Sequence, residues 1–292
     1  MLSRRLITTL VFVPPFLLGL FTDTPGNLVL AIMGAGCAIW GLAEFYKLTA
    51  HLGAKPPRTW LYIVALGGPF VIYSNYRFGL DLKWMLGWVG LALIGIIGFM
   101  VKNGIIDRSW ETFLASITSV VYILTPLWLI QIFKLADHGV WFIVFAFFNT
   151  WLADTGAYFG GKQFGKHKMS PTISPGKTWE GFASGILLSV IGVLAVGAIQ
   201  HAMVSPESSA RFFWTEGSNV DILRLAILAF GMVLTANLGD LTESMLKRDL
   251  GVKDSGSSLT GHGGFLDIMD SLLINIPLLF IWGLLFEGLG LS

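Results

Sequence analysis

The side chains best suited to chemistry are concentrated in residues 239–270, near the end of the sequence. A helix beginning at Gly239 would place four polar residues on one stripe, at spacings i, i+3, i+4 and i+7: Asp240, Glu243, Ser244 and Lys247. Asp267 and Asp270 are three residues apart, so they would share one face of the next helix. Carboxylates that face one another across helices suit Mg²⁺, which prefers oxygen ligands and usually retains water and substrate phosphate.

Positive charges and glycines accompany these carboxylates. The basic side chains are Lys247, Arg248 and Lys253, and the glycines are Gly256, Gly261, Gly263 and Gly264. Glycine lets the backbone bend closely around a ligand, and His262 lies between two of these glycines. These residue types favour a site for a metal ion and phosphates. Structural ion pairs at a membrane surface, or a proton or ion pathway of intramembrane acids, are the open alternatives.

Two earlier segments carry related chemistry. Asp154 and Tyr158 are four residues apart and would share a helix face, where a charge near lipid is costly and typical of a binding role. Ser174, Lys177 and Thr178 offer hydroxyl and ammonium donors just before a predicted helix, whose first N–H groups attract anions. A structural hydrogen bond for the aspartate and an ordinary solvated loop before the helix are the open alternatives.

The composition places these residues in an integral membrane protein. Of the 292 residues, 54% are hydrophobic and 13% charged, with a mean hydropathy of +0.72, whereas soluble domains carry about 25% charged residues. Nine apolar segments approach the roughly 20 residues that a membrane-spanning helix requires: residues 6–21, 27–45, 59–75, 84–101, 112–133, 139–161, 181–203, 221–246 and 271–289. We therefore predict an all-α polytopic membrane protein with about nine transmembrane helices in one bundle.

The distribution of lysine and arginine predicts the orientation in the membrane. With a cytoplasmic N-terminus, 14 of the 19 lysines and arginines fall in cytoplasmic segments, as the positive-inside rule requires. These segments are residues 1–5, 46–58, 102–111, 162–180 and 247–270. The two richest in motifs, 162–180 and 247–270, would then face the cytoplasm together.

No repeat or soluble domain is visible, which favours one integral membrane domain over residues 1–292, with its catalytic half at about 139–275. The net charge of +1 gives no general attraction to nucleic acid, so no nucleic-acid partner is expected. The single cysteine, Cys37, excludes an internal disulfide and a cysteine metal site.

Glycine spacing predicts where two helices pack closely. Gly156 and Gly160, and again Gly181 and Gly185, are four residues apart in or beside apolar helices. Small residues at this spacing let helix backbones approach each other. We expect helix packing at both pairs.

Together these motifs resemble those of the phosphatidate cytidylyltransferase family, also called CDP-diacylglycerol synthases. The most specific match is Ser244-x-x-Lys-Arg-x-x-x-x-Lys-Asp-Ser-Gly, followed by Gly261-His-Gly-Gly-x-x-Asp-x-x-Asp. Ala153-Asp-Thr-Gly-Ala-Tyr-Phe, Ser174-Pro-x-Lys-Thr-x-Glu-Gly and Gly239-Asp-Leu-x-Glu-Ser are also similar to family segments. The resemblance is specific over about residues 150–275.

The resemblance implies a nucleotidyltransferase of phospholipid biosynthesis that converts CTP and phosphatidate, or a related lipid phosphate, to CDP-diacylglycerol and pyrophosphate. It implies Mg²⁺ or another divalent cation, held by Asp240, Asp267 and Asp270. The catalytic residues it implies are Lys177, Lys247, Asp240 and Asp267. The residues it implies for substrate and phosphate binding are Asp154, Ser174, Lys177, Ser244, Lys247, Arg248, Lys253 and His262. The expected location is a bacterial inner membrane, in contact with lipid and with the active site facing the cytoplasm; a homodimer is left open.

The sequence departs from the family pattern at two positions. Ile268 follows Asp267 where the family usually has arginine, and Thr260 stands before the Gly-His-Gly-Gly segment where proline is common. Losing the arginine removes a permanent charge and a planar group suited to phosphate. Three alternatives therefore stay open: CTP-dependent chemistry on another lipid phosphate, a transporter whose aspartates carry protons, and a catalytically silent membrane paralogue.

Overall fold

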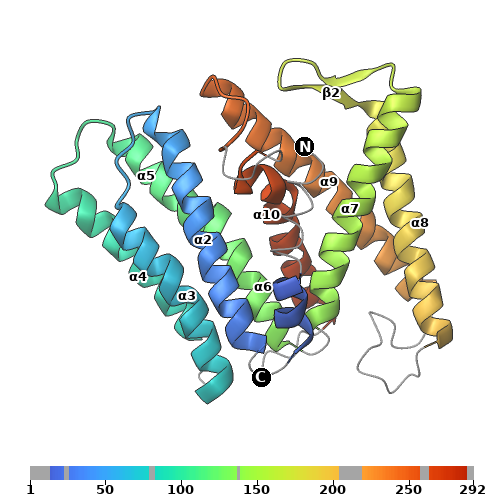
Figure 1. Cartoon of the computed structure of the whole chain (residues 1–292), viewed down its shortest axis with the longest axis horizontal. Helices are drawn as coiled ribbons and strands as arrows, with labels where there is room; N and C mark the ends of the chain where they lie inside the picture. The colour runs from blue at the N-terminus through green and yellow to red at the C-terminus, as the bar shows by residue number, and fades with distance from the viewer. Residues whose placement is uncertain are drawn as a thin grey trace. The chain divides into compact units, whose positions relative to one another are not determined.

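The protein is built almost entirely from helices, as Figure 1 shows. This computed structural model describes residues 14–22, 26–78, 83–136, 139–203, 219–256 and 263–287. A helical segment over 14–21 precedes the labelled elements, which are α2 (Gly26–Ala50), α3 (Arg58–Phe78), α4 (Lys83–Lys102), α5 (Ser109–Thr118), η1 (Ser119–Leu124), α6 (Thr125–Leu135), α7 (Gly139–Phe164), β1 (Lys168–Ser170), β2 (Ser174–Thr178), α8 (Trp179–Met203), α9 (Asn219–Asp249), α10 (Phe265–Trp282) and η2 (Gly283–Glu287). The predicted all-α class is confirmed, with the addition of one short β-hairpin.

Seven helices within the described residues are long and apolar enough to cross a membrane. They are Leu28–Ala50, Lys83–Lys102, Ser109–Leu135, Gly139–Phe164, Trp179–Ile199, Ile222–Asp249 and Phe265–Phe286, and they match seven of the nine predicted segments. Predicted segment 59–75 is helical as part of α3 but is not among the seven. Most of predicted segment 6–21 lies outside the described residues. The prediction of an integral membrane protein therefore fits the structure.

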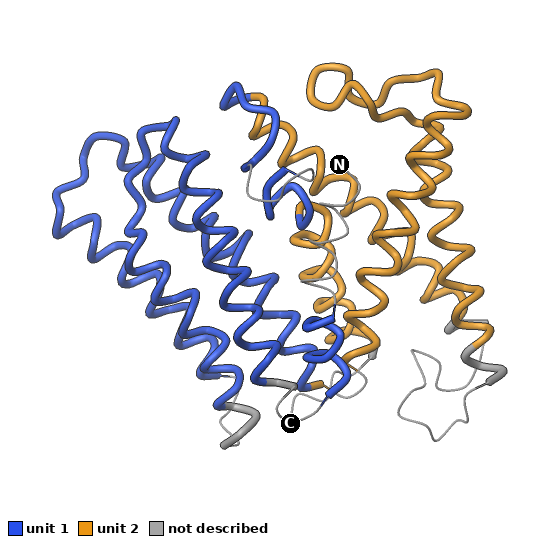
Figure 2. Tube along the Cα trace, viewed as in Figure 1, with its two compact units in different colours: residues 1–135, 249–269, 291–292 blue, residues 136–248, 270–290 orange. Residues whose placement is uncertain are grey.

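The chain forms two compact units, coloured separately in Figure 2. Unit 1 contains residues 1–135, 249–269 and 291–292, and unit 2 contains residues 136–248 and 270–290. The boundary near the C-terminus falls inside α10, between Met269 and Asp270. The prediction of a single domain stays a prediction.

Unit 1 is a layer of apolar helices in which α2 packs against α3 and α6, and α3 packs against α4. Its core includes the fully buried side chains of Leu42, Leu61, Ile96, Ile123 and Phe133. The helix over Ser109–Leu135 changes to π geometry at η1, just before Pro126. Proline has no N–H for the helical ladder, and the Thr125 hydroxyl donates to the Val120 carbonyl at 2.9 Å, which supports the wide turn.

In unit 2, α7 and α8 are in close backbone contact along their glycines. A Cβ atom added at Gly156 would lie 2.7 Å from the Ser184 carbonyl oxygen, and one at Gly185 would lie 2.7 Å from the Ala153 carbonyl oxygen. Gly181 faces the Ala157 carbonyl oxygen in the same way, also at 2.7 Å. These glycines are therefore packing residues, as their spacing predicts.

Replacing Gly185 by valine is expected to destabilise unit 2, because its Cβ would clash with the backbone of α7. Overpacking of this kind costs about 1–3 kcal/mol, which would be measured as unfolding in a detergent–denaturant titration. Gly90→Val on α4 is the matched control, since a Cβ there meets nothing within 4 Å. Equal stability of the two variants would contradict the close contact.

A buried polar network joins the four long helices of unit 2. Asn275 on α10 donates to the Thr150 hydroxyl on α7 at 2.8 Å and accepts from the Thr235 hydroxyl on α9 at 2.6 Å. The Ser189 hydroxyl on α8 donates to Asn149 Oδ1 on α7. Polar groups within a bilayer require such partners, so the network fixes how these helices meet one turn away from Asp154.

Candidate active site

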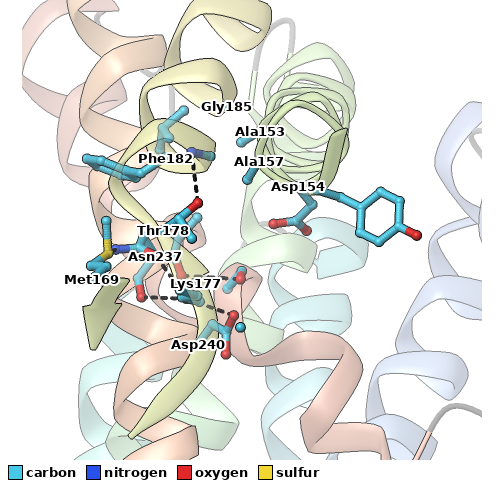
Figure 3. Close-up of a pocket in the computed structure, with 16 residues that line it drawn as sticks. Ala153, Asp154, Ala157, Met169, Lys177, Thr178, Phe182, Gly185, Asn237 and Asp240 are labelled. Atoms are coloured by element: carbon cyan, nitrogen blue, oxygen red, sulfur yellow. Dashed lines mark hydrogen bonds and ion pairs between the residues drawn. The ribbon is translucent and has the colours of Figure 1, made fainter. Parts of the chain in front are cut away.

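A cavity of about 300 Å³ lies within unit 2 (Figure 3). Residues of α7, β1, β2, α8, α9 and α10 line it. Its polar and ionisable lining residues are Asp154, Tyr158, Lys177, Thr178, Asn237, Asp240 and Ser271. The structure therefore brings together three segments that the sequence marks separately, those around Asp154, Lys177 and Asp240.

The β-hairpin between α7 and α8 carries Lys177 to this cavity. Strands β1 and β2 are antiparallel, and Lys168 pairs with Thr178. Glu180, in the first turn of α8, accepts hydrogen bonds from the backbone N–H groups of Lys166 and His167 at 3.1 Å each. The Thr178 hydroxyl accepts from the Gly181 N–H at 3.1 Å, which caps α8. Lys177 therefore lies on the paired strand β2, directly before the residue that caps α8.

The Lys177 ammonium group forms an ion pair with Asp240 of α9. Its Nζ lies 2.8 Å from Asp240 Oδ2 and donates to Asn237 Oδ1 at 2.9 Å and to the Asn237 carbonyl at 3.3 Å, contacts that Figure 3 draws as dashed lines. The other Asp240 oxygen accepts from the Ser244 hydroxyl at 3.2 Å. The side chains of Lys177 and Asp240 are 21% and 38% exposed, so both are partly buried and partly accessible.

Negative charge exceeds positive charge around the cavity. Asp154, Asp240 and Asp270 are close enough for their charges to interact, whereas Lys177 is the one basic side chain among the described residues that line the cavity. A divalent cation would relieve this repulsion, and carboxylate oxygens are the ligands that Mg²⁺ prefers.

Among the described residues, no group of three or more His, Cys, Asp or Glu side chains is arranged to hold a metal ion. Mg²⁺ is commonly bound by one or two carboxylates together with water and substrate phosphates. The described carboxylates alone therefore do not complete a metal site, and a cation here would need water or phosphate oxygens as further ligands.

The predicted stripe on α9 is confirmed as a set of neighbours, but its lysine is already paired. Lys247 Nζ lies 3.1 Å from Glu243 Oε2, and both residues are buried, at 9% and 3% exposure. Arg248, at the end of the same helix, donates from Nε to the Ile173 carbonyl at 3.4 Å, which links α9 to the hairpin turn. The phosphate-binding roles of Lys247 and Arg248 stay predictions.

The remaining predicted residues are not among the described residues that line the cavity. Ser174 begins β2, opposite Ser170, and the described lining residues do not include it. Lys253 is exposed and belongs to unit 1. Asp267 and Ile268, which is 43% exposed, lie in the first turn of α10, in the part of that helix that belongs to unit 1. Asp270 lies in unit 2, where one of its oxygens accepts from the neighbouring Ser271 N–H. His262 lies outside the described residues.

Two polar residues of the cavity lining, Asn237 and Ser271, were not predicted from the sequence. Asn237 contacts Lys177 through both its side chain and its carbonyl, and its Nδ2 lies 3.3 Å from the Met169 sulfur. Ser271 lines the cavity and donates to the Ala236 carbonyl at 3.2 Å. A signal for Asn237 exists in the sequence, because it is a polar residue one helical turn before Asp240 in an otherwise apolar segment.

Comparison with known proteins agrees with the motifs at these positions. The sequence profile of the cytidylyltransferase family matches residues 3–286. The chain belongs to the cytidylyltransferase family. Three of its relatives carry the name phosphatidate cytidylyltransferase. The Haemophilus influenzae protein is 30% identical, over 95% of this chain and 96% of its own length. The Staphylococcus saprophyticus and Staphylococcus aureus proteins are 38% and 32% identical, each over 94% of both chains.

Family membership thus extends to almost the whole chain, well beyond the motif-bearing residues 150–275. In this member of the family, one cavity brings the ammonium group of Lys177 together with the carboxylates of Asp240 and Asp154.

Proposed function

We propose that this protein transfers the cytidylyl group of CTP to phosphatidate, giving CDP-diacylglycerol and pyrophosphate. The observation that carries the proposal is the Lys177–Asp240 ion pair in a polar cavity, in a chain whose relatives over nearly its full length are named phosphatidate cytidylyltransferase. In the reaction, a phosphate oxygen of the lipid forms a bond to the α-phosphorus of CTP. The bond from that phosphorus to pyrophosphate breaks.

Repulsion between the two substrates is the main barrier to this reaction. A phosphate monoester carries roughly −1.5 to −2 charges near pH 7, and CTP is also an anion. A protein therefore accelerates the transfer chiefly by positioning and charge neutralisation. We assign Lys177 to contact a phosphate of the substrates, with Lys247, Arg248 and Lys253 as further phosphate ligands.

The proposed roles of the polar residues follow from their chemistry. Asp154 orients a cation or a group of the nucleotide, and Ser174, Ser244 and His262 donate hydrogen bonds. Asp240, with Asp270, would hold a divalent cation such as Mg²⁺, which neutralises phosphate charge when bound. Asp267 enters this proposal through its sequence motif, because it belongs to unit 1.

We further propose about nine transmembrane helices with a cytoplasmic N-terminus, in a bacterial inner membrane. Support comes from the seven apolar helices and from the concentration of lysine and arginine in alternate connecting segments. This orientation would place the active site on the cytoplasmic side, where soluble CTP meets a lipid of the bilayer. Assembly into a homodimer is part of the same proposal.

The function is tested with purified protein in liposomes that contain phosphatidate, supplied with Mg²⁺ and CTP labelled at the α- or γ-phosphate. We expect the α-label in lipid and the γ-label in pyrophosphate, because the cytidylyl group is transferred. A γ-label in lipid would indicate a CTP-dependent lipid kinase. Absence of both labels from lipid, in protein that remains folded, would contradict the proposed function and favour a silent paralogue with Ile268 in place of arginine.

A further inference from the structure

Glu44 is a buried carboxylate of unit 1 that no motif includes. It lies near the end of α2 and is only 2% exposed. Its Oε1 accepts from the Trp40 indole N–H at 3.0 Å. Its Oε2 accepts from the Leu266 backbone N–H at 3.1 Å and from the Ser255 hydroxyl at 3.3 Å. A buried carboxylate is costly unless it is hydrogen-bonded, so these three donors account for its place inside the protein.

The same serine also binds Asp267, the aspartate of the last motif. Asp267 Oδ2 accepts from the Ser255 N–H at 2.9 Å, from the Ser255 hydroxyl at 3.0 Å and from the Gly264 N–H at 2.7 Å. The contact with Gly264 is half of a capping box, in which an acid in the first turn satisfies an N–H at the helix start. The Ser255 hydroxyl carries a single proton, which it shares between the carboxylates of Glu44 and Asp267, and it thereby connects the two.

Two glycines of the motif region fit closely against the Glu44 carboxylate. A Cβ atom at Gly256 would lie 2.8 Å from Glu44 Oε1, and one at Gly264 would clash with Glu44 Oε2 and with the Ser255 hydroxyl. On α2, Trp40 stacks on Phe265 with ring centroids 5.7 Å apart. The backbone at Gly256 and at the start of α10 thus packs closely against the end of α2.

We propose that Glu44 is a positioning residue: it holds Ser255 and the first turn of α10, and through them it sets the orientation of the Asp267 carboxylate. Glu44 needs no contact with substrate for this role. The consequence for catalysis rests on the proposed function, in which Asp267 acts on the reacting phosphates or their cation.

Hydrogen exchange tests the positioning role without any substrate. In Glu44→Gln, the side chain keeps its size but loses its charge, and hydrogen bonds to charged groups are stronger than those to neutral ones. The amide hydrogens of Ser255, Gly264 and Leu266 are therefore expected to exchange about tenfold faster or more. Peptides from the hairpin over 168–178 should be unchanged. Thr49→Val is the control, because the hydroxyl of this buried α2 residue donates to the Phe45 carbonyl of its own helix, at 3.0 Å.

Kinetics in liposomes tests the link to Asp267. Groups that orient a catalytic ligand typically contribute 10–100-fold, so Glu44→Gln is expected to lower kcat by about that factor with a smaller change in KM for CTP. Thr49→Val should keep both constants. Unchanged exchange in Glu44→Gln would overturn the positioning role, and faster exchange with unchanged kcat would overturn its link to catalysis.

A second variant covers the case in which Glu44→Gln does not fold. Trp40→Phe removes one hydrogen-bond donor to Glu44 and keeps an aromatic ring against Phe265. Amide exchange is therefore expected to be faster and kcat lower than in the wild type, but by less than in Glu44→Gln. Wild-type exchange and kcat in Trp40→Phe would then count against the proposal. A wild-type protein without cytidylyl transfer would refute the proposed function, while the exchange result would still decide the role of Glu44.

Discussion

Asp240→Asn is expected to lower cytidylyl transfer by at least about 10²–10³-fold, the cost of removing one charge-stabilising group from an active site. The substitution keeps the shape of the side chain and its contact with Ser244, but it removes the charge that faces Lys177 at 2.8 Å. It also removes a proposed ligand of the divalent cation. The initial rate of α-label transfer from CTP to lipid is the measurement.

The matched control for Asp240→Asn is Thr242→Ala, two residues along α9. The Thr242 hydroxyl donates to the Leu238 carbonyl of its own helix at 2.7 Å, and the described cavity lining does not include this residue. Thr242→Ala should keep the wild-type rate. Both variants are first compared by size-exclusion chromatography in detergent, so that loss of activity is not loss of fold. Wild-type turnover in Asp240→Asn would refute the metal assignment and the cavity as the active site.

Lys177→Met is expected to reduce kcat/KM for CTP by about 10²–10³-fold, because the cavity would lose its basic lining residue. Methionine retains the length and apolar stem of the side chain. Lys177→Arg should recover only part of the activity, since a planar guanidinium cannot replace an ammonium group held between Asp240 and Asn237. Steady-state kinetics at varied CTP provides the measurement.

Lys168→Met is the control for Lys177→Met, because Lys168 is an exposed lysine on the neighbouring strand of the same hairpin. It should leave kcat/KM unchanged. The double variant Lys177→Met/Asp240→Asn should be about as active as the poorer single variant, because partners in one ion pair are not additive. Strictly additive losses would show that the two residues act separately, against the geometry of the cavity.

The helical architecture was largely predictable because the bilayer constrains the chain so strongly. Uninterrupted apolar segments within a membrane must be helical, and seven of the predicted segments are helices of spanning length. Segment 59–75 shows the limit of this reasoning: α3 is helical, yet Arg58, Thr59 and Ser74 make it less apolar than its neighbours. Length and hydropathy identify a helix, whereas its place relative to the membrane depends on its packing.

The site was predictable where spacing along one helix determines which side chains are neighbours. The stripe through Asp240 and Ser244 is such a case, and the structure confirms their contact. The hairpin that carries Lys177 was not predicted, since a turn of Pro171, Thr172 and Ile173 forms too short a signal in a membrane protein. Glu44 was missed for another reason: its partner Leu266 is 222 residues away in the sequence, and helical periodicity carries no information on such contacts.

The glycine contact between α7 and α8 has a consequence for how the protein responds to its lipid surroundings. A bilayer that is thinner or thicker than the hydrophobic length of a helix makes that helix tilt. Two helices whose backbones touch at Gly156, Gly181 and Gly185 must tilt as one rigid pair. Asp154 on one and the Lys177 strand that leads into the other therefore keep their spacing, so we expect the geometry of the cavity to be insulated from changes in acyl-chain length.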